Sequence, residues 1–359
     1  MQTVVVDYRN ICKIQSYSIF SGNIPSIFPT EFDEIQHRIA KRLFCIREEY
    51  PDAIMILAAD TPPYWRHRWL NKWYSEQGLE PVEYKGTRAK RSWNFETPKE
   101  SMDSMYEIIY EQVGNLIGAY RICSQGLEAD DIWGIIATVG FGEIIGISTD
   151  SDWQQMIGKF DNRRVVIDDP VKNIVVSEKA DITMKLIAGE AGDNIIGCPK
   201  IKKDGTSSKN WGIDGVKTLL KDNPDDWMEA GKIDKKVFER NRMVIQLPCP
   251  MWNISDVAEE LNEVTIAPVT YTEDEQNALW HGYGMSVRAR ELYKSKAERD
   301  KWLTSLRLKM IDMIDKAPKS KAVKEEQEEL ADMPKVDQQT DPSSAPPIGF
   351  DQCVSAGAM

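Results

Sequence analysis

Aspartate residues follow three short apolar segments that have the composition of buried β-strands. The segment VVVD ends at Asp7, IMILAAD ends at Asp60 and EIIGISTD ends at Asp150. In an open parallel sheet the ligand crevice lies beyond the carboxyl ends of the strands, so side chains that follow different strands converge there. A single aspartate after a strand is usually a helix cap or a turn former. Three in the same position instead predict a shared acidic site.

Two further segments supply acidic residues at short spacing. EADDIWGII has the pattern of an amphipathic helix, with Glu128, Asp130 and Asp131 in its first turn, where a helix N-terminus tolerates negative charge. Helix capping alone accounts for one or two of these three acids. STDSDW places Asp152 two residues after Asp150, and in an extended segment such side chains point to the same side. This pair is suited to binding a cation.

Another acidic segment, GEAGDNIIG, places Glu190 and Asp193 among glycines that allow close approach of the backbone. Six or more carboxylates packed together require compensating cations. The histidines lie far apart in the sequence, so oxygen atoms are the expected ligands, and these suit Mg²⁺ or Mn²⁺. Two such ions about 3.5 to 4 Å apart hydrolyse a phosphodiester without a nucleophilic side chain. The predicted metal ligands are Asp7, Asp60, Glu128, Asp130, Asp131, Asp150, Asp152 and Asp193.

The elements that must position these residues alternate along the first 180 residues. Short apolar runs of β-type composition are separated by longer stretches whose apolar residues recur at three- and four-residue spacing. The predicted strands are Thr3–Val6, Ala53–Ala58, Glu143–Ser148 and Arg164–Ile167. The predicted helices are Thr30–Glu49, Ser101–Ala119 and Ala129–Val139. This alternation is typical of an α/β domain with a central, mostly parallel sheet.

The composition changes twice further along the chain. Residues 181–316 show no series of strands and are rich in helix formers, which predicts a second, helical region with a boundary near residue 180. Residues 317–359 are rich in Pro, Ser, Gln and charge and contain few aliphatic side chains. Such a segment cannot offset the entropy lost on ordering, so a disordered tail is predicted.

The overall composition narrows the class of protein. A chain of 359 residues that is 42% hydrophobic can bury an enzyme-sized core. Its first residues, MQTVVVDYRN, do not resemble a signal peptide, and no apolar run approaches the roughly 20 residues that span a bilayer. A cytoplasmic protein with free thiols is therefore expected. The net charge of −12 opposes general binding to nucleic acid, although divalent ions would offset part of a clustered acidic site.

A basic and aromatic segment, YWRHRWLNKWYSEQGLEPVEYKGTRAKRSW, lies between Asp60 and Glu128. In an acidic protein it is the expected phosphate-contacting stretch, with aromatic rings available to stack on unpaired bases. The alternative is an amphipathic helix with Trp69 and Trp73 on its core face, but YKGTRAKR is too polar for that interpretation. The predicted nucleic-acid contacts here are Arg66, Arg68, Tyr84, Lys85, Arg88, Lys90 and Arg91.

A second basic stretch, PKIKKDGTSSKNWGIDGVKTLL, follows Asp193 and has the pattern of a helix, a glycine-bearing turn and a helix. In their order along the chain, these motifs resemble the 5′ nuclease or flap endonuclease superfamily, and within it the ribonuclease H of T-even phages. The likeness covers about residues 1 to 270: Asp60 followed by YWR, then YKGTR, EADD, STDSD, and GDN followed by GVKT.

The resemblance implies a PIN-like 5′ nuclease domain over residues 1–180, with a helical arch over about 62–125. A helical DNA-binding region over 181–316 would follow, with a helix-three-turn-helix over about 186–222, and then the disordered tail. The implied activity is removal of RNA primers and 5′ flaps during phage lagging-strand replication with two Mg²⁺ ions, for which Mn²⁺ substitutes. The implied partners are DNA and RNA–DNA hybrid with 5′ ends or flaps, and a single-stranded DNA-binding protein or clamp. A monomer without membrane attachment, in the host cytoplasm, is expected.

The resemblance also assigns roles to individual residues. Those assigned to the first ion are Asp7, Asp60, Glu128 and Asp130. Those assigned to the second are Asp150, Asp152 and Asp193, with Asp130 shared and Asp131 in support. Glu190 stands where the family commonly has Asp, so it is not among the implied ligands.

Further implied roles concern the substrate. Lys85 and Arg88 would contact the scissile phosphate beside a base-stacking Tyr84, which makes Lys85, Arg88, Asp130 and Asp150 the implied catalytic residues. The residues implied to hold downstream duplex are Gly212, Gly215 and Lys217, although KIKKDGTSSKNW lengthens the loop before them.

Two other functions are compatible with parts of the pattern. A PIN-like single-strand ribonuclease gathers carboxylates in the same way, but such modules are short, whereas this chain continues for about 130 residues beyond Asp181. A noncatalytic replication factor with a decayed site would have lost several acids. Here every acidic position except Glu190 retains the expected type.

Overall fold

The computed structural model describes residues 2–19, 29–86, 99–202 and 204–285. Three of the predicted phosphate contacts, Arg88, Lys90 and Arg91, lie outside this range, as does the predicted tail 317–359. By its contacts the chain divides into residues 1–308 and 309–359, and all the structure described here belongs to the first of these units. No helix in the described ranges is long and apolar enough to cross a membrane.

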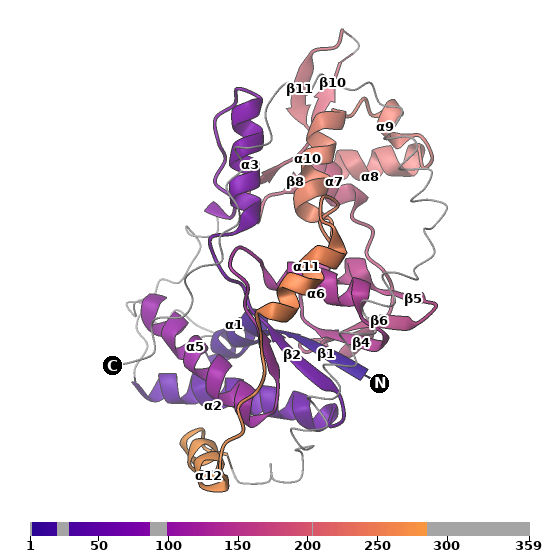
Figure 1. Cartoon of the computed structure of the whole chain (residues 1–359). Helices are drawn as coiled ribbons and strands as arrows, with labels where there is room; N and C mark the ends of the chain where they lie inside the picture. The colour runs from indigo at the N-terminus through magenta and orange to yellow at the C-terminus, as the bar shows by residue number, and fades with distance from the viewer. Residues whose placement is uncertain (1, 20–28, 87–98, 203, 286–359) are drawn as a thin grey trace. The chain divides into compact units, whose positions relative to one another are not determined.

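A parallel sheet forms the centre of the fold (Figure 1). Its parallel strands lie in the order β3 (Tyr120–Ile122), β2 (Ile54–Ala58), β1 (Gln2–Asp7), β4 (Gly142–Ile147) and β6 (Arg163–Asp169). Four of these strands were predicted, because both faces of such a strand are buried and its sequence is then a continuous apolar run. The predicted α/β class with a mostly parallel sheet is confirmed.

Antiparallel strands complete both edges of the sheet. β12 (Thr265–Ile266) pairs with β3, while β5 (Gly158–Phe160) and β7 (Ile174–Val176) pair with β6. β12 comes from the region predicted to be helical. A strand of two residues is too short to show the alternating pattern by which strands are predicted.

Helices cover both faces of the sheet (Figure 1). α1 (Tyr8–Ile19), α2 (Pro29–Glu49) and α5 (Lys99–Leu116) share a core with Val4, Val6 and Leu57 of the strands. On the other face lie α6 (Ala129–Val139) and the 3-10 helix η1 (Ser151–Met156), whose stacked rings Trp133 and Trp153 contact the strand residue Gly146. α11 (Ile254–Glu263) packs on α6.

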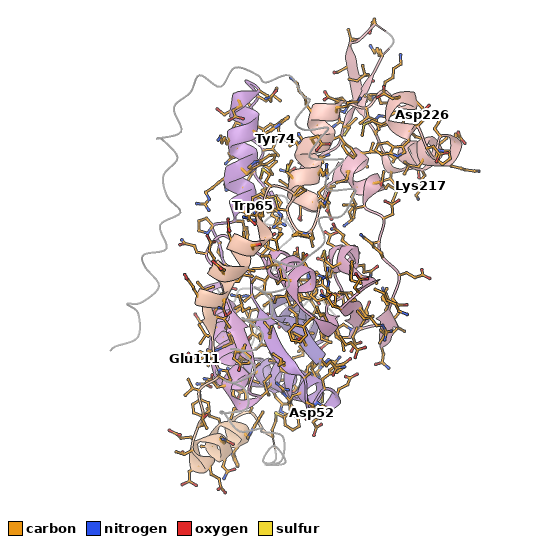
Figure 2. All side chains as sticks on the ribbon, turned by 45° about the vertical axis from the view of Figure 1, so that its right-hand side comes forward. Asp52, Trp65, Tyr74, Glu111, Lys217 and Asp226 are labelled. Carbon is orange, nitrogen blue, oxygen red and sulfur yellow. The ribbon has the colours of Figure 1, made fainter. Side chains whose placement is uncertain are left out.

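A second core lies around α3 (Trp65–Glu76), α7 (Thr183–Ala188), α8 (Ile213–Asp222) and α10 (Lys235–Ile245), with the short α9 (Trp227–Ala230) beside them. Figure 2 shows Tyr74 of α3 beside α10, where its hydroxyl accepts a hydrogen bond of 3.1 Å from Arg240. Two small hairpins join α7 to α8: β8 (Gly189–Glu190) with β9 (Ile195–Ile196), and β10 (Pro199–Ile201) with β11 (Ser207–Asn210). The lengthened loop of the sequence is therefore a polar β-hairpin, which hydrophobic periodicity could not reveal.

The end of the described chain returns to the first core. Trp280 and Tyr283, from α12 (Glu273–Gly282) and the residue after it, are buried with Ile39, Leu43 and Phe44 of α2. The change in composition near residue 180 therefore marks no break in packing.

Candidate active site

Three aspartates follow neighbouring strands at one edge of the sheet, as their positions in the sequence predict. Asp7 is the last residue of β1 and lies in register with Ala58, two residues before Asp60, while Asp150 follows β4 on the other side of β1. Asp7 is buried and accepts hydrogen bonds from the Asn10 amide at 3.1 Å and from the Ser148 hydroxyl at 2.9 Å. These bonds fix its carboxylate at the strand end.

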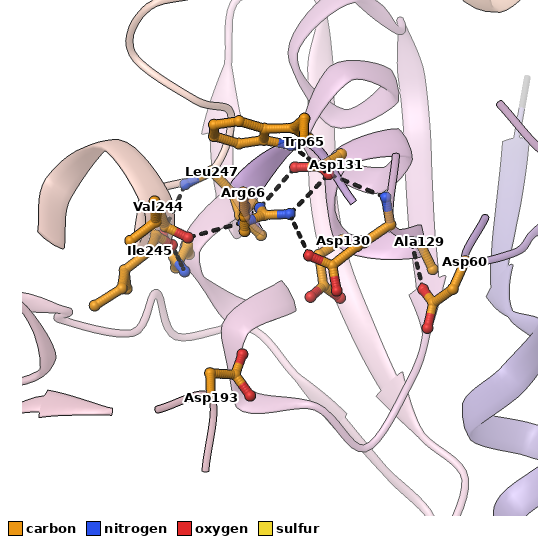
Figure 3. Close-up of polar contacts among 12 residues, drawn as sticks. Asp60, Trp65, Arg66, Ala129, Asp130, Asp131, Asp193, Val244, Ile245 and Leu247 are labelled. Carbon is orange, nitrogen blue, oxygen red and sulfur yellow. Dashed lines mark hydrogen bonds and ion pairs between the residues drawn. The ribbon is translucent and has the colours of Figure 1, made fainter. Parts of the chain in front are cut away.

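The amino terminus of α6 is directed at the same edge. Asp60 accepts a hydrogen bond of 2.8 Å from the amide of Ala129, the first residue of α6 (Figure 3). Asp60 thus caps this helix, as a lone aspartate after a strand often does, and in doing so it brings Glu128 and Asp130 to the strand ends. The indole Nε1 of Trp153 donates to Asp130 at 2.7 Å and orients that carboxylate.

The acidic pair after β4 is held by a tight turn. One carboxylate oxygen of Asp150 accepts the amide hydrogen of Asp152 at 2.9 Å. Asp152 in turn lines a pocket together with Asp130, Glu190 and Asp193. Residues from three distant parts of the sequence therefore border one hollow.

The β8–β9 turn carries Asp193 and is joined to the segment that follows α3. The Lys85 amide donates to the Asp193 carbonyl at 2.9 Å, and the Asn194 side chain donates to the Glu83 carbonyl at 2.9 Å. Lys85 has a positive φ of 58°, and its ammonium group pairs with Glu128. The predicted catalytic lysine thus lies at the carboxylate cluster.

Burial and the charges of neighbouring carboxylates raise the pKa of two acids of the cluster, Asp7 and Asp130. Burial, and then the charge of Asp60, raises the pKa of Asp7 to about 7. Burial, followed by the charges of Asp150, Glu128 and Asp7, raises the pKa of Asp130 well above its usual range. Burial and the neighbouring carboxylates thus destabilise the charged form of both side chains, and bound cations would reverse this effect.

Two lysines compensate part of the negative charge. Lys85 pairs with Glu128, and Lys185 of α7 pairs with Asp152 at 2.5 Å and with Glu190 at 3.2 Å. With the side chains in these positions, no three Asp, Glu, His or Cys residues of the described ranges surround one point closely enough to bind an ion. The ligand types fit hard divalent cations, because all the donors are carboxylate oxygens.

Arg66 and Asp131 form a buried ion pair at the start of α6. Arg66 is 3% exposed, and its guanidinium pairs with both oxygens of Asp131 at 2.6 and 2.7 Å and with Glu128 at 2.7 Å. Asp131 is fully buried and also accepts from the Trp65 indole at 3.0 Å (Figure 3). Arg66 also lines the pocket that Asp130, Asp152 and Asp193 border, so it lies beneath the carboxylate cluster with its guanidinium on Asp131 and Glu128.

Tyr84 also lies at the carboxylate cluster. Its side chain is 8% exposed, and its hydroxyl donates to Glu128 at 3.0 Å and to Asp193 at 3.2 Å. It lines the same pocket as Asp130 and Asp152, and its two hydrogen bonds orient the carboxylates of Glu128 and Asp193.

The remaining predicted nucleic-acid contacts lie outside the carboxylate cluster. Arg68 is exposed on α3. Gly212 caps α8, Gly215 lies against the Trp211 ring, and Lys217 is 62% exposed on the same helix (Figure 2). The first turns of α8 therefore expose one cation, Lys217, and one carboxylate, Asp214, with 4.0 Å between the Lys217 Nζ and the Asp214 carboxylate.

Two residues of the site were missed. Trp153 follows STDSD directly, so its position beside the acids could have drawn attention to it. Lys185 belongs to a helical stretch, TMKLIA, in which nothing distinguishes it from a solvated lysine. Only the packing of α7 shows where it lies.

The raised pKa of Asp7 makes a testable prediction about pH. Asp7 binds its proton more tightly in the folded protein than in the unfolded chain, where its pKa is about 3.9. Its stabilising contribution is therefore complete below about pH 4 and is lost as the pH rises towards 7. In EDTA, the wild type should lose more thermal stability between pH 5 and 7.5 than Asp7→Asn does. Mg²⁺ should raise the unfolding temperature more at pH 7.5 than at pH 5, and an equal increase at both would contradict a cation bound by Asp7.

Solved structures of bacteriophage T5 proteins are similar to this chain. One of a T5 protein co-crystallised with metal ions has a TM-score of 0.49 at 14% identity, covering 74% of this chain and 99% of that chain. A T5 5′-exonuclease with zinc ions bound has a TM-score of 0.48 at 15% identity, with coverage of 74% and 99%. A T5 flap endonuclease in a pseudo-enzyme-product complex with DNA and metal ions has 0.48 at 13% identity, with coverage of 79% and 100%.

The second and third of these proteins are named as a 5′-exonuclease and a flap endonuclease of phage T5, not of a T-even phage. No protein-family model and no curated protein matches the chain.

Proposed function

We propose that this chain is a divalent-metal-dependent 5′ nuclease that hydrolyses phosphodiester bonds near 5′ ends. The observation that carries the proposal is the convergence of Asp7, Asp60, Asp130 and Asp150, which come from separate chain segments. After burial, the charges of Asp60 and Asp150 raise the pKa of Asp7, and the charges of Asp150 and Asp7 contribute to the raised pKa of Asp130. Such a concentration of carboxylates is costly in the absence of cations, and a stable fold retains it where cations are used.

Two groups of ligands are proposed. The first comprises Asp7, Asp60, Glu128 and Asp130, and the second comprises Asp150, Asp152 and Asp193, with Asp130 shared. Mg²⁺ bound there would supply a water of lowered pKa and would stabilise the charge on the leaving oxygen. The chain itself orients the ligands, through Asn10 and Ser148 for Asp7 and through Trp153 for Asp130.

Lys85 is proposed to bind the scissile phosphate. Its ammonium group now lies on Glu128 and near the rings of Tyr64 and Tyr84, with 5.2 Å to each ring centroid. A phosphate and a cation arriving together would exchange partners with this pair, because the cation takes Glu128 and the phosphate takes the ammonium. Arg88 is proposed for the same phosphate from its place in YKGTR.

The proposed substrates are 5′ flaps and RNA primers annealed to DNA, as in phage lagging-strand replication. Support comes from the order of the motifs and from two exposed basic residues, Arg68 on α3 and Lys217 on α8. A cytoplasmic monomer that works with a single-stranded DNA-binding protein or clamp belongs to the same proposal.

Cleavage assays with three end-labelled substrates test the proposal. These are a 5′-flap DNA, a nicked duplex with a 5′ RNA segment, and a single-stranded RNA, each with Mg²⁺ or with EDTA. We expect cleavage of the first two near the 5′ end, with Mg²⁺ only. Cleavage in EDTA would refute metal dependence, and cleavage of the single-stranded RNA alone would favour the PIN-like ribonuclease.

A further inference from the structure

Lys185 takes the position between two acidic groups where a cation would be expected. Its Nζ lies 2.5 Å from an oxygen of Asp152 and 3.2 Å from an oxygen of Glu190. All three side chains are partly buried, with 29%, 19% and 24% of their surfaces exposed. The Lys185 ammonium group between these two carboxylates supplies one positive charge, where a divalent ion would supply two.

The lysine is placed by two elements that pack independently of it. It projects from α7, whose Leu186 and Ile187 are buried in the second core, so the helix is anchored on its other side. Glu190 lies in the β8–β9 hairpin, whose close pairing depends on Gly189 with its positive φ of 74°. Both partners are thus held in place by backbone packing, and Lys185 does not swing freely in solvent.

Glu190 differs from the other acids of the site. It borders the pocket that Asp130, Asp152 and Asp193 also line, yet its partner is Lys185. Its longer side chain reaches the lysine, which accounts for a glutamate at this position in a site otherwise built mainly from aspartates. Lys185 and Glu190 therefore act as a pair.

We propose that Lys185 is the resident counterion of the second metal position, and that a divalent cation binds at Asp152 only by displacing its ammonium group. This inference rests on the proposed two-metal function. It predicts that the second ion binds more weakly than the first in the free protein. The Lys185 ammonium group and the second divalent ion compete for Asp152. The more weakly bound of the two ions is therefore the one whose affinity depends on Lys185.

Titration of the free protein with Mn²⁺, without DNA, tests the inference. The concentration of unbound Mn²⁺ is followed by electron paramagnetic resonance in the wild type and in Lys185→Met, Lys185→Ser and Lys185→Arg. Lys185→Met and Lys185→Ser should raise the affinity for the more weakly bound Mn²⁺ ion about tenfold, since each removes the positive charge that competes for its ligands. Lys185→Arg should match the wild type. The control, Lys235→Met, removes an exposed lysine that pairs with Glu229 at 2.7 Å, and it should change nothing.

The outcomes separate this inference from the proposed function. If Mn²⁺ binds the wild type and both neutral variants with equal affinity, or binds the variants more weakly, Lys185 is not a competitor and the inference is overturned. If neither the wild type nor any variant binds Mn²⁺, both this inference and the proposed metal site are refuted. A crystal structure of the wild type with Mn²⁺ adds a second measurement, in which the Lys185 Nζ should have left Asp152 and Glu190.

Discussion

Asp150→Asn is expected to lower cleavage of 5′-flap DNA by at least about a thousandfold, with little change in DNA affinity. Asp150 lies among the acids, and its charge is the largest electrostatic influence, after burial, on the pKa of Asp130. The neutral amide is a poor metal ligand. Its oxygen can still accept the Asp152 amide hydrogen that Asp150 accepts at 2.9 Å, so the turn should be retained.

The same variant should be more stable than the wild type in EDTA, because it removes one of several charges that repel one another. Asp181→Asn is the matched control. Asp181 accepts the Thr183 amide hydrogen at 2.9 Å in the same two-residue geometry, but it is exposed. This control should leave both cleavage and stability unchanged. If Asp150→Asn lost DNA binding in proportion to activity, or became less stable in EDTA, Asp150 would have a structural role instead of a metal-binding one.

Arg66→Ala is expected to lower the free energy of unfolding by about 3 to 5 kcal/mol, the usual cost of removing one partner of a buried ion pair. Arg66, Glu128 and Asp131 are each at most 3% exposed. Without the guanidinium, two carboxylates at the start of α6 lose their compensating charge inside the protein. The carbonyl of Val244 also loses its hydrogen bond of 2.9 Å. Urea unfolding followed by circular dichroism measures the loss.

Arg38→Ala provides the comparison for Arg66. Arg38 pairs with Glu34 at 2.6 Å on the surface of α2, and both side chains are at least 40% exposed. Its loss should cost less than about 1 kcal/mol, because solvent screens such pairs. Equal effects of the two substitutions would mean that Arg66 is not the internal support of the α6 terminus. If Arg66→Ala left the protein stable but lowered its DNA affinity, that result would support the predicted role of Arg66 in nucleic-acid binding.

The strand ends and α6 were predictable because the signals that define them are local. The three valines before Asp7 form a continuous apolar run because both faces of a central parallel strand are buried. The first polar residue after such a run marks the carboxyl end of the strand. α6 was predicted from Ala129 to Val139, as it is observed, since its acidic first turn and apolar periodicity lie within one segment. Asp7, Asp60 and Asp150 could therefore be placed at one edge from the sequence alone.

The partners of the charged side chains could not be predicted in this way. Arg66 is one of several basic residues of α3, and Lys185 is the one basic residue of α7. The sequence does not show whether such a residue points to solvent or to a buried acid. Arg66 is buried because α3 packs where Glu128 and Asp131 begin α6, more than 60 residues away. Lys185 is placed by α7, which the second core anchors.

The acidic cluster at the strand ends was thus determined by the sequence, through the period and composition of single segments. Which acids are available to a cation was decided by the tertiary structure. Asp131 is paired with Arg66 and Asp152 with Lys185, whereas Asp7 accepts its hydrogen bonds from Asn10 and Ser148, and Asp130 from Trp153. The physical reason is that charge compensation depends on distances of a few ångströms between segments that are far apart in the chain, and local patterns contain no information about those distances.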